Sequence, residues 1–199
     1  MTGELPYCIQ CGSLERHRTN RLIFEKLRDA TFSDLHVLQF SPDNSVVPAW
    51  FKSFEVSIYG GTNSLDLMRI DRPNNKYDLV ICNHILEHVQ YDKLALVELG
   101  RITTPDGFVF LSFPDPARVE KTVDWDEPRA DLHYHWRVYG KDVAERFRLS
   151  VPHMYVLKYD TEDPVTRASD TVYLLTRTES AARNLGGKLG DFEFINQPE

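Results

Sequence analysis

Two apolar runs separated by an amphipathic stretch dominate the middle of the chain. Residues 79–82 (LVIC) and 108–113 (FVFLSF) lack a regular polar alternation, which predicts strands that are buried on both faces. Over residues 92–102, apolar positions recur at helical spacing after Asp92, a candidate N-cap. A turn is expected at residues 105–107 (PDG), where Asp-Gly tolerates a tight reversal. This order of elements predicts a βαβ crossover between parallel strands.

Weaker patterns on both sides extend this unit into a larger sheet. Two early strands are predicted at residues 35–40 (LHVLQF) and 54–59 (FEVSIY). Helices are expected over residues 13–30, 46–53 and 141–149. Near the end of the chain, residues 155–159 and 171–176 flank a turn-rich segment, which predicts an antiparallel hairpin at the closing edge of the sheet. The pattern therefore predicts an α/β fold with a mostly parallel sheet.

The composition is that of a soluble globular protein. Of the 199 residues, 42% are hydrophobic and 27% are charged, and the length suits one domain. No apolar run approaches the roughly twenty residues that span a bilayer, and the first twelve residues lack the pattern of a signal peptide. We therefore expect a cytoplasmic protein without membrane partners. The net charge of −7 argues against a nucleic-acid substrate.

Polar side chains follow the first buried run directly. Asn83 and His84 come immediately after residues 79–82, where a parallel strand would deliver them to the carboxyl edge of the sheet. In open α/β sheets this edge is where ligands bind. The sequence therefore predicts a ligand site around Asn83 and His84.

The same stretch resembles a known family. The pieces YDLVICNHILEHV, LVELGRI, TPDG and FVFLSFP, in this order, are similar to class I S-adenosylmethionine-dependent methyltransferases of the type 11-like kind. CIQCGSLERHR near the N-terminus and LHYHWRVYG after the fourth strand also resemble segments of such relatives. The resemblance implies a Rossmann-like fold with a mostly parallel, seven-stranded sheet and a C-terminal antiparallel hairpin. We expect one domain over residues 1–178, including an N-terminal CxxC segment at 1–20, and a C-terminal tail or surface strap at 179–199.

The resemblance implies S-adenosylmethionine as the cofactor, bound across the carboxyl ends of the strands. Where the family has a glycine-rich loop after the first strand, this chain has residues 41–45 (SPDNS), and residues 59–63 hold no acid for the ribose. Asp71 matches the acid that faces the adenine, although a turn residue before Pro73 is an equal interpretation. The residues assigned to the cofactor are Gln39, Phe40, Ser41, Asp43, Tyr59, Gly60, Gly61, Asp71, Asn83, His84 and His88.

Two histidines are candidates for the chemistry. By resemblance, His84 lines the methionine end of the cofactor, while Glu87 and His88 secure the loop or contact a ligand. His133 belongs to a segment rich in histidine and aromatic residues, and an imidazole can act as a general base because its pKa lies near working pH. The alternative for this segment is that its aromatic residues, such as Trp136, plug the loop onto the core.

Three patterns resemble metal sites, but none is complete in the sequence. Residues 84–88 match H-x-x-E-H, the motif of inverted zinc metalloproteases, yet that motif requires a helix throughout and a strand ends just before it. Cys8 and Cys11 form a CxxC without a second pair, and a structural zinc needs four ligands. His133 and His135 are a bare pair. The sequence therefore predicts no metal site.

The sequence is compatible with two functions. The first is a methyltransferase that acts on a small-molecule or sugar-type acceptor; its oligomeric state is left open, with a homodimer as one option. The second is a non-catalytic protein that kept the fold and serves as a binding or assembly subunit. The altered loop at residues 41–45 favours the second function, and the intact segment around Asn83 favours the first.

Overall fold

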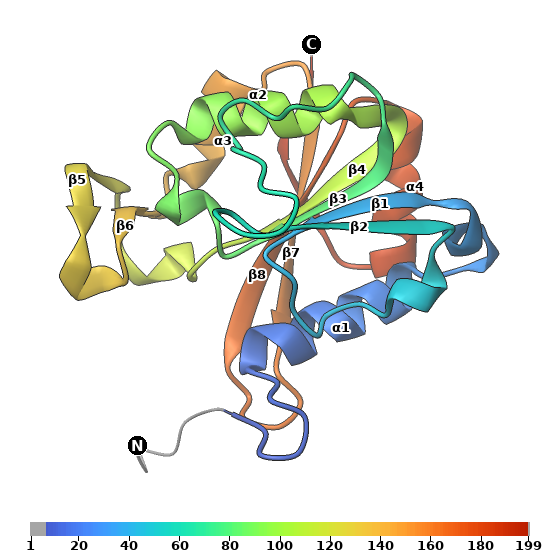
Figure 1. The fold of residues 1–199 in the computed structure, drawn as a ribbon, viewed down its shortest axis with the longest axis horizontal. Helices are drawn as coiled ribbons and strands as arrows, with labels where there is room; N and C mark the ends of the chain where they lie inside the picture. Colours follow the sequence, from blue (N-terminus) through green and yellow to red (C-terminus); the bar gives the residue numbers. More distant parts are fainter. Residues whose placement is uncertain (1–6, 199) are drawn as a thin grey trace.

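The two buried runs form the centre of a large mixed sheet (Figure 1). The computed structural model describes residues 7–198, and within them the main sheet has seven strands in the order β2-β1-β3-β4-β8-β7-β9. Four neighbouring strands are parallel: β2 (Ser53–Ser57), β1 (His36–Phe40), β3 (Tyr77–Asn83) and β4 (Thr103–Ser112). Three antiparallel strands complete the sheet: β8 (Ser169–Thr176), β7 (Tyr155–Glu162) and β9 (Glu193–Asn196). The predicted fold class is confirmed.

Helices cover both faces of this sheet (Figure 1). Val80 faces a core with α2 (Asp92–Ile102) and α3 (Val143–Ser150). Ile81 faces the opposite core, which contains α1 (Glu15–Leu27) and α4 (Glu179–Leu189). Because successive strand residues point to opposite faces, a strand covered on both sides has to be apolar at every position, as residues 79–82 are.

Short 3-10 turns connect these elements, and one of them replaces an expected helix. The turns are η1 (Ala30–Asp34), η2 (Pro48–Trp50), η3 (Leu86–His88), η4 (Pro116–Arg118) and η5 (Ala130–Leu132). The helix predicted over residues 46–53 is wrong, because only η2 is helical there. Phe51 instead packs against Phe32 and stacks on Phe54, so aromatic contacts, not helical periodicity, fix this segment.

Two details of the central crossover also differ from expectation. Asp92 is the first residue of α2 and its carboxylate does not cap the helix; it accepts a hydrogen bond from the Tyr139 hydroxyl at 2.9 Å. The turn expected at residues 105–107 lies inside β4, where the pairing register with β3 shifts. A Cβ at Gly107 would come within 2.5 Å of the Asp78 carbonyl oxygen, so this irregularity requires glycine.

The C-terminal segment is part of the packed fold, which corrects the expectation of a tail. Residues 179–189 form α4, whose Ala182, Leu185 and Leu189 are buried in the core on the α1 side of the sheet. Residues 193–196 form β9, which pairs with β7 at the edge. A glycine pair inside the helix weakened the periodic signal, and burial against the sheet stabilises the helix nonetheless.

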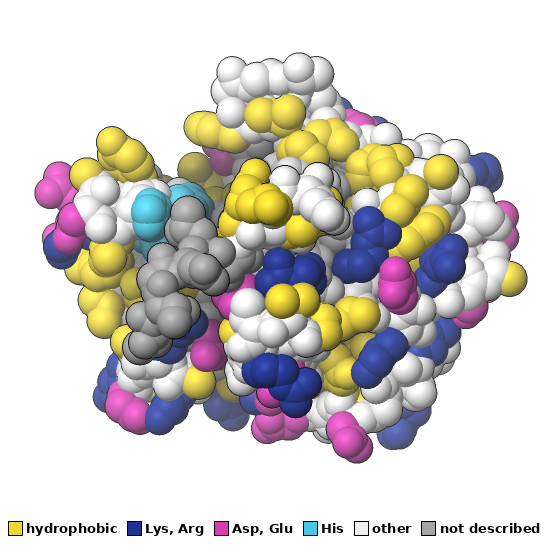
Figure 2. Space-filling view, turned by 90° about the horizontal axis from the view of Figure 1, so that it is seen from below, with side chains coloured by type: hydrophobic (Ala, Val, Ile, Leu, Met, Phe, Trp, Pro, Cys, Tyr) yellow, Lys and Arg dark blue, Asp and Glu magenta, His cyan; other side chains and the backbone are white. Residues whose placement is uncertain are grey.

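A separate hairpin projects from the carboxyl side of the main sheet (Figure 1). It consists of β5 (Val123–Arg129) and β6 (His135–Val138), which pair antiparallel. Histidine side chains lie at the surface on this side of the molecule, whereas Lys and Arg elsewhere on the same face alternate with hydrophobic and acidic side chains (Figure 2). Within residues 7–198, no helix combines the length and the apolar character needed to cross a bilayer.

An ion pair joins the start of α1 to the β7–β8 connection, and it makes stability depend on pH. Arg18 donates two hydrogen bonds to the buried carboxylate of Asp163, at 2.8 and 2.7 Å. These bonds, against the opposing effect of burial, lower the pKa of Asp163 to about 2. A lowered carboxyl pKa contributes stability above the pKa of the unfolded chain, and that contribution is lost as the pH falls through the folded value.

We therefore expect Asp163→Asn to lower the free energy of unfolding at pH 7 by about 2 kcal/mol. The difference from wild type should shrink as the pH falls from about 4 to about 2. Urea unfolding at pH 7, 4 and 2.5 measures this. The exposed Asp126→Asn is the control and should match wild type throughout. A difference that stays constant with pH would contradict this account.

Candidate functional site

A chain of polar side chains crosses the carboxyl ends of three parallel strands. Asn83, the last residue of β3, donates to Asp43 at 3.1 Å and accepts from the Ser112 hydroxyl of β4 at 3.1 Å. Gln39 of β1 donates to the same Asp43 carboxylate at 3.1 Å. Gln39, Asn83 and Ser112 are buried. The structure thus brings together Gln39, Asp43 and Asn83, and it adds Ser112, which sequence reasoning did not single out.

The loop after β1 turns tightly without glycine. Ser41 adopts a positive φ of 49°, and its N–H donates to the Ser57 carbonyl at the end of β2, at 2.9 Å. Asp43 then accepts a hydrogen bond from the backbone N–H of Ser45 at 2.7 Å. Positive φ is the conformation that glycine favours, and the hydrogen bonds of this loop hold a serine in it. The loop therefore passes close to the sheet edge, as a glycine-rich loop would.

The remaining residues predicted near the ends of β1 and β2 differ in what they can offer a ligand. The Phe40 side chain is buried in the core, so only its backbone faces the edge. Tyr59 is 79% exposed just beyond β2. Gly60 and Gly61 follow in a turn in which Gly61 N–H donates to the Ile58 carbonyl at 2.8 Å. These residues lie at the carboxyl edge, as expected from the sequence.

Asp71 does not join this edge. Its side chain is exposed, and the carbonyls of both neighbouring residues accept hydrogen bonds from Arg101, at 2.8 and 2.7 Å. Arg101 lies in the last turn of α2, beside the amino end of β4, which begins at Thr103. Because Asn83 pairs with the opposite end of β4, Asp71 and Asn83 lie toward different ends of the sheet. The turn interpretation fits this position better than a cofactor contact.

His84 is held in a strained conformation at the edge of a cavity. It adopts a positive φ of 52°, and its N–H donates to the Ser112 carbonyl at 2.8 Å. The cavity has a volume of about 210 Å³ and is also lined by Thr19, Asp115 and Asp170. The Nε2 atom of His84 is buried and has no hydrogen-bond partner among the described residues. Strain and an unpaired buried polar atom are both typical of functional positions.

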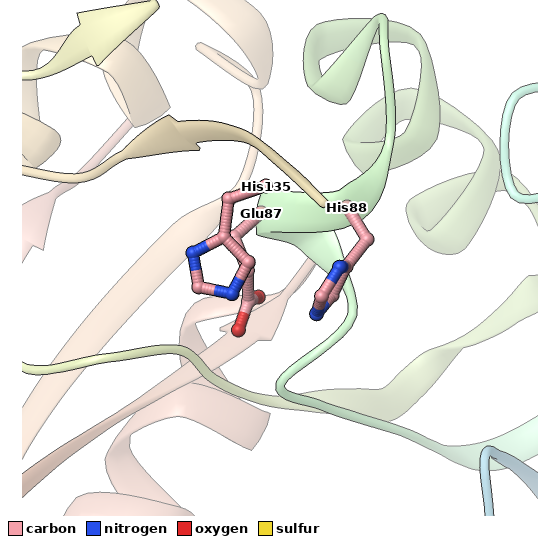
Figure 3. Close-up of side chains that lie close together, drawn as sticks. All are labelled: Glu87, His88 and His135. Atoms are coloured by element: carbon pink, nitrogen blue, oxygen red, sulfur yellow. The ribbon is translucent and has the colours of Figure 1, made fainter. Parts of the chain in front are cut away.

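A second group of polar side chains, Glu87, His88 and His135, lies close together (Figure 3). Glu87 and His88 come from η3, and His135 comes from β6; one nitrogen or oxygen atom from each lies within 4.8 Å of the others. His84 Nδ1 is 3.5 Å from Glu87 Oε1. His133, the other predicted catalytic residue, is exposed, and its ring centroid lies 6.2 Å from that of His135. The structure therefore places His84 at a cavity, whereas the side chain of His133 is exposed on the β5–β6 hairpin.

The environment of His135 favours an uncharged imidazole. Burial lowers the pKa of His135 below its ordinary value; the carboxylate of Glu87 acts against this, and His88 and His133 lower it further. A neutral imidazole near neutral pH has a free lone pair for a proton or a metal ion. His135 is linked to the cavity through Glu87, because Glu87 lies near His135 and contacts His84, which lines the cavity.

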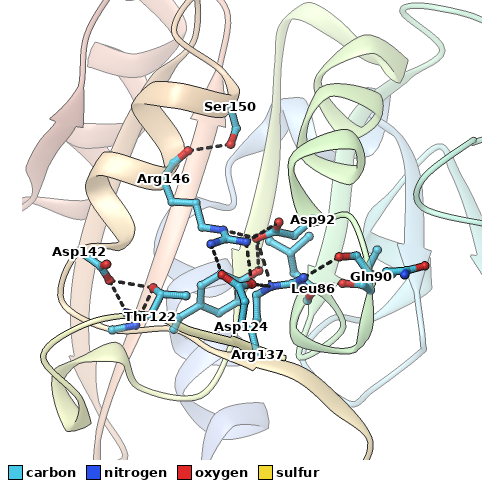
Figure 4. Close-up of polar contacts among 12 residues, drawn as sticks. Leu86, Gln90, Asp92, Thr122, Asp124, Arg137, Asp142, Arg146 and Ser150 are labelled. Atoms are coloured by element: carbon cyan, nitrogen blue, oxygen red, sulfur yellow. Dashed lines mark hydrogen bonds and ion pairs between the residues drawn. The ribbon is translucent and has the colours of Figure 1, made fainter. Parts of the chain in front are cut away.

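A buried ionic network holds the hairpin against the sheet (Figure 4). Arg137 of β6 is 3% exposed and donates to the carbonyls of Leu86 and Gln90, at 3.0 and 2.7 Å, and to that of Val89. Its Nε atom donates to Asp124 of β5 at 2.8 Å. Because these carbonyls belong to η3 and the residues after it, Arg137 fixes His135 relative to Glu87 and His88.

The Cys8–Cys11 pair shows no completed metal site. The Cys11 thiol donates to the Ser13 hydroxyl at 3.2 Å, and hydrogen bonding with Ser13 lowers the pKa of Cys11. His17 accepts a hydrogen bond from the backbone N–H of Leu14 at 3.3 Å. Among the residues from 7 to 198, neither cysteine joins a group of three ligand side chains.

A larger cavity lies beside the first, on the antiparallel side of the sheet. It has a volume of about 830 Å³ and shares Asp115 and Asp170 with the cavity at His84. Its lining mixes acidic side chains such as Glu162 with the lysines Lys141 and Lys158. A volume of this size accommodates a small polar molecule.

Comparison with known proteins agrees with this architecture. No curated protein matches the sequence. Residues 23–150 match the model of a family described as "Methyltransferase domain". A SAM-dependent methyltransferase from Thermotoga maritima superposes with a TM-score of 0.53 at 10% identity, over 82% of this chain and 91% of that chain.

A second solved structure shares the fold to the same degree. It is a chain from the complex between the Haloferax volcanii Trm112 methyltransferase activator and a methyltransferase. The superposition has a TM-score of 0.52 at 9% identity and covers 82% of this chain and 91% of that chain. At such low identities the superpositions show the fold alone. The family match spans well over half of the 199 residues, from α1 through α3, and includes the polar edge around Asn83. The chain belongs to the methyltransferase domain family, whose class I members use S-adenosylmethionine as cofactor.

Proposed function

We propose that this protein binds S-adenosylmethionine at the carboxyl ends of β1, β2 and β3 and transfers its methyl group to a small-molecule or sugar-type acceptor. The observation that carries the proposal is the polar chain from Gln39 through Asp43 to Asn83. It lies where the family binds its cofactor, and the family match over residues 23–150 supports the enzyme over a non-catalytic subunit. The altered loop at residues 41–45 is compatible with binding, because Ser41 supplies the positive φ.

The residues at the edge fit the polar groups of this cofactor. Its amino group and ribose hydroxyls need hydrogen-bond acceptors, and the Asp43 carboxylate and Asn83 amide oxygen supply them. Its carboxylate needs donors, which the Gln39 and Asn83 amides supply. When bound, the cofactor supplies an electrophilic methyl group on a sulfonium.

His84 is the best-placed residue to handle a proton of the acceptor. His84 lines the cavity of about 210 Å³, which adjoins the larger cavity, and its buried Nε2 has no hydrogen-bond partner among the described residues. The backbone of His84 is held in a defined conformation with positive φ, which fixes the position of the residue at the sheet edge. Holding the acceptor in line with the methyl group can then contribute much of the rate acceleration. The mixed acidic and basic lining of the larger cavity suits a small polar acceptor with hydroxyl or amino groups.

Titration calorimetry with S-adenosylmethionine and S-adenosylhomocysteine tests the proposal. We expect both to bind, and Asn83→Ala to weaken binding roughly tenfold or more, because Asn83 links Asp43 to Ser112 and loses its own contacts as well. Asp71→Ala is the matched control: it also removes a polar side chain from the predicted set, but its position away from Asn83 predicts unchanged affinity.

Two outcomes would overturn parts of this proposal. Absence of binding at millimolar cofactor, by a protein shown to be folded by circular dichroism, would exclude the methyltransferase and return attention to a binding subunit. Binding that weakens for Asp71→Ala but not for Asn83→Ala would place the cofactor elsewhere on the sheet.

A further inference from the structure

Glu87 is a buried carboxylate whose charge is only partly compensated. The residue is 1% exposed, and its Oε2 atom is buried without a hydrogen-bond partner among the described residues. The other oxygen, Oε1, has His84 Nδ1 at 3.5 Å, a distance that is long for a hydrogen bond. Burying a carboxylate is costly unless it is paired or coordinates a cation. The unpaired Oε2 atom therefore indicates a position at which a cation could bind.

Two imidazoles converge on this carboxylate. Figure 3 shows the Glu87 carboxylate lying between the rings of His88 and His135. The two rings meet edge to face with centroids 4.6 Å apart, and one donor atom from each of the three residues lies within 4.8 Å of the others. Donor atoms that each lie about 2 Å from one tetrahedral metal ion are about 3.3 Å apart, so small rotations of these side chains would bring all three within bonding distance of one ion. The side chains are thus arranged around a point that a single ion could occupy.

We propose that Glu87, His88 and His135 bind one divalent transition-metal ion. Two imidazoles and one carboxylate are a ligand set for zinc and similar ions, whereas magnesium and calcium prefer oxygen ligands. Three protein ligands leave coordination positions open for water or another molecule, as in catalytic metal sites. The exclusion of a metalloprotease is unaffected, because η3 is a short 3-10 turn and not the helix which that motif requires.

Neighbouring residues hold the ligands in place. His84 contacts the Oε1 atom of Glu87 and leaves the buried Oε2 atom without a partner among the described residues. Arg137 ties β6, which carries His135, to the carbonyls at η3, which carries Glu87 and His88. Hydrogen bonds from residues that do not touch the metal orient the ligand side chains, and their loss weakens metal binding. The sequence alone could not show this site, because its third ligand comes from the distant β5–β6 hairpin.

The ion would give the protein a Lewis acid next to the cavity at His84. An oxygen or nitrogen atom of an acceptor could occupy an open coordination position there. This role rests on the proposed methyltransferase function, but metal binding itself does not. The two can therefore be tested separately.

Calorimetric titration of the full chain with zinc chloride, after removal of metal by chelation, measures the site. Cys8→Ser/Cys11→Ser serves as the background in every experiment, because free thiols could bind zinc independently. We expect one ion per chain, and affinity lowered on the order of 100-fold in Glu87→Gln, His88→Ala and His135→Ala. The exposed His153→Gln is the matched control and should bind as the background does. Magnesium chloride should bind far more weakly.

Cobalt substitution supplies a spectroscopic readout that needs neither cofactor nor acceptor. Visible absorption of bound Co²⁺ should appear in the background protein and be lost in the three ligand variants. Because His88 is exposed, His88→Ala should keep its fold, which circular dichroism and thermal melting check. Binding below one ion per chain, or affinity unchanged by His88→Ala and His135→Ala in folded protein, would refute the metal site and leave an ordinary His84–Glu87 ion pair. Neither result bears on S-adenosylmethionine binding, which is measured without metal.

Discussion

Arg137→Met is expected to lower the free energy of unfolding by about 3 to 5 kcal/mol. The guanidinium is buried and donates to three backbone carbonyls and to Asp124, and it lies 3.6 Å from Asp92. Methionine fills a similar volume but donates no hydrogen bond, so the carbonyls lose their donors and a buried acidic group loses part of its compensation. Urea unfolding followed by circular dichroism measures the loss.

The same hairpin offers a matched control for Arg137. Arg129 lies in β5 and is 43% exposed, where it pairs with Asp131. Because exposed ion pairs contribute little, Arg129→Met should change stability by no more than about 0.5 kcal/mol. A folded Arg137→Met protein should also bind zinc roughly tenfold more weakly or worse, since its hairpin no longer fixes His135. Equal stability of the two variants would show that the network in Figure 4 is not important for the fold.

Phe110→Ala is expected to cost about 3 to 5 kcal/mol as well, for a different reason. Phe110 lies in the central strand β4, is fully buried, and stacks on Phe24 of α1 with ring centroids 4.3 Å apart. Truncation would remove the apolar contact and leave a cavity between α1 and the sheet, which the rigid strands on both sides cannot close. Thermal and urea unfolding should both report the loss.

A double-mutant cycle isolates the stacked pair. Phe24→Ala, Phe110→Ala and the double variant should show a coupling of about 0.5 to 1.5 kcal/mol, because each single change already removes the ring contact. Leu94→Ala, at a 53% exposed position on α2, should remain within about 0.5 kcal/mol of wild type. Additive costs for the two phenylalanines would mean that α1 is held to the sheet by other contacts.

The fold could be predicted wherever the local pattern and the final burial agree. β3 and β4 are apolar at nearly every position because helices cover both of their faces, and so the central crossover was recognisable. The helix predicted over residues 46–53 was wrong, since only η2 forms there, and α4 was missed. The η2 segment is held by aromatic contacts, and α4 contains two glycines and depends on burial of Leu185 and Leu189.

The candidate site likewise has one part that could be predicted from the sequence and one part that could not. Gln39, Asp43 and Asn83 could be expected together, because parallel strands deliver their ends to one edge whatever the rest of the chain does. Asp71 could not be placed, since it follows a long irregular segment whose path depends on Arg72 and Arg101.

The sequence by itself determined the α/β class, the central crossover, the family resemblance and the polar residues at the strand ends, because each of these depends on short-range order along the chain. Only the tertiary structure decided that Glu87 and His88 meet His135 and that Asp71 lies apart from the edge. It also decided that residues 179–196 complete the core. These features depend on contacts between segments far apart in sequence, such as the bonds from Arg137 to the carbonyls at η3, and local periodicity carries no information about which distant segments will meet.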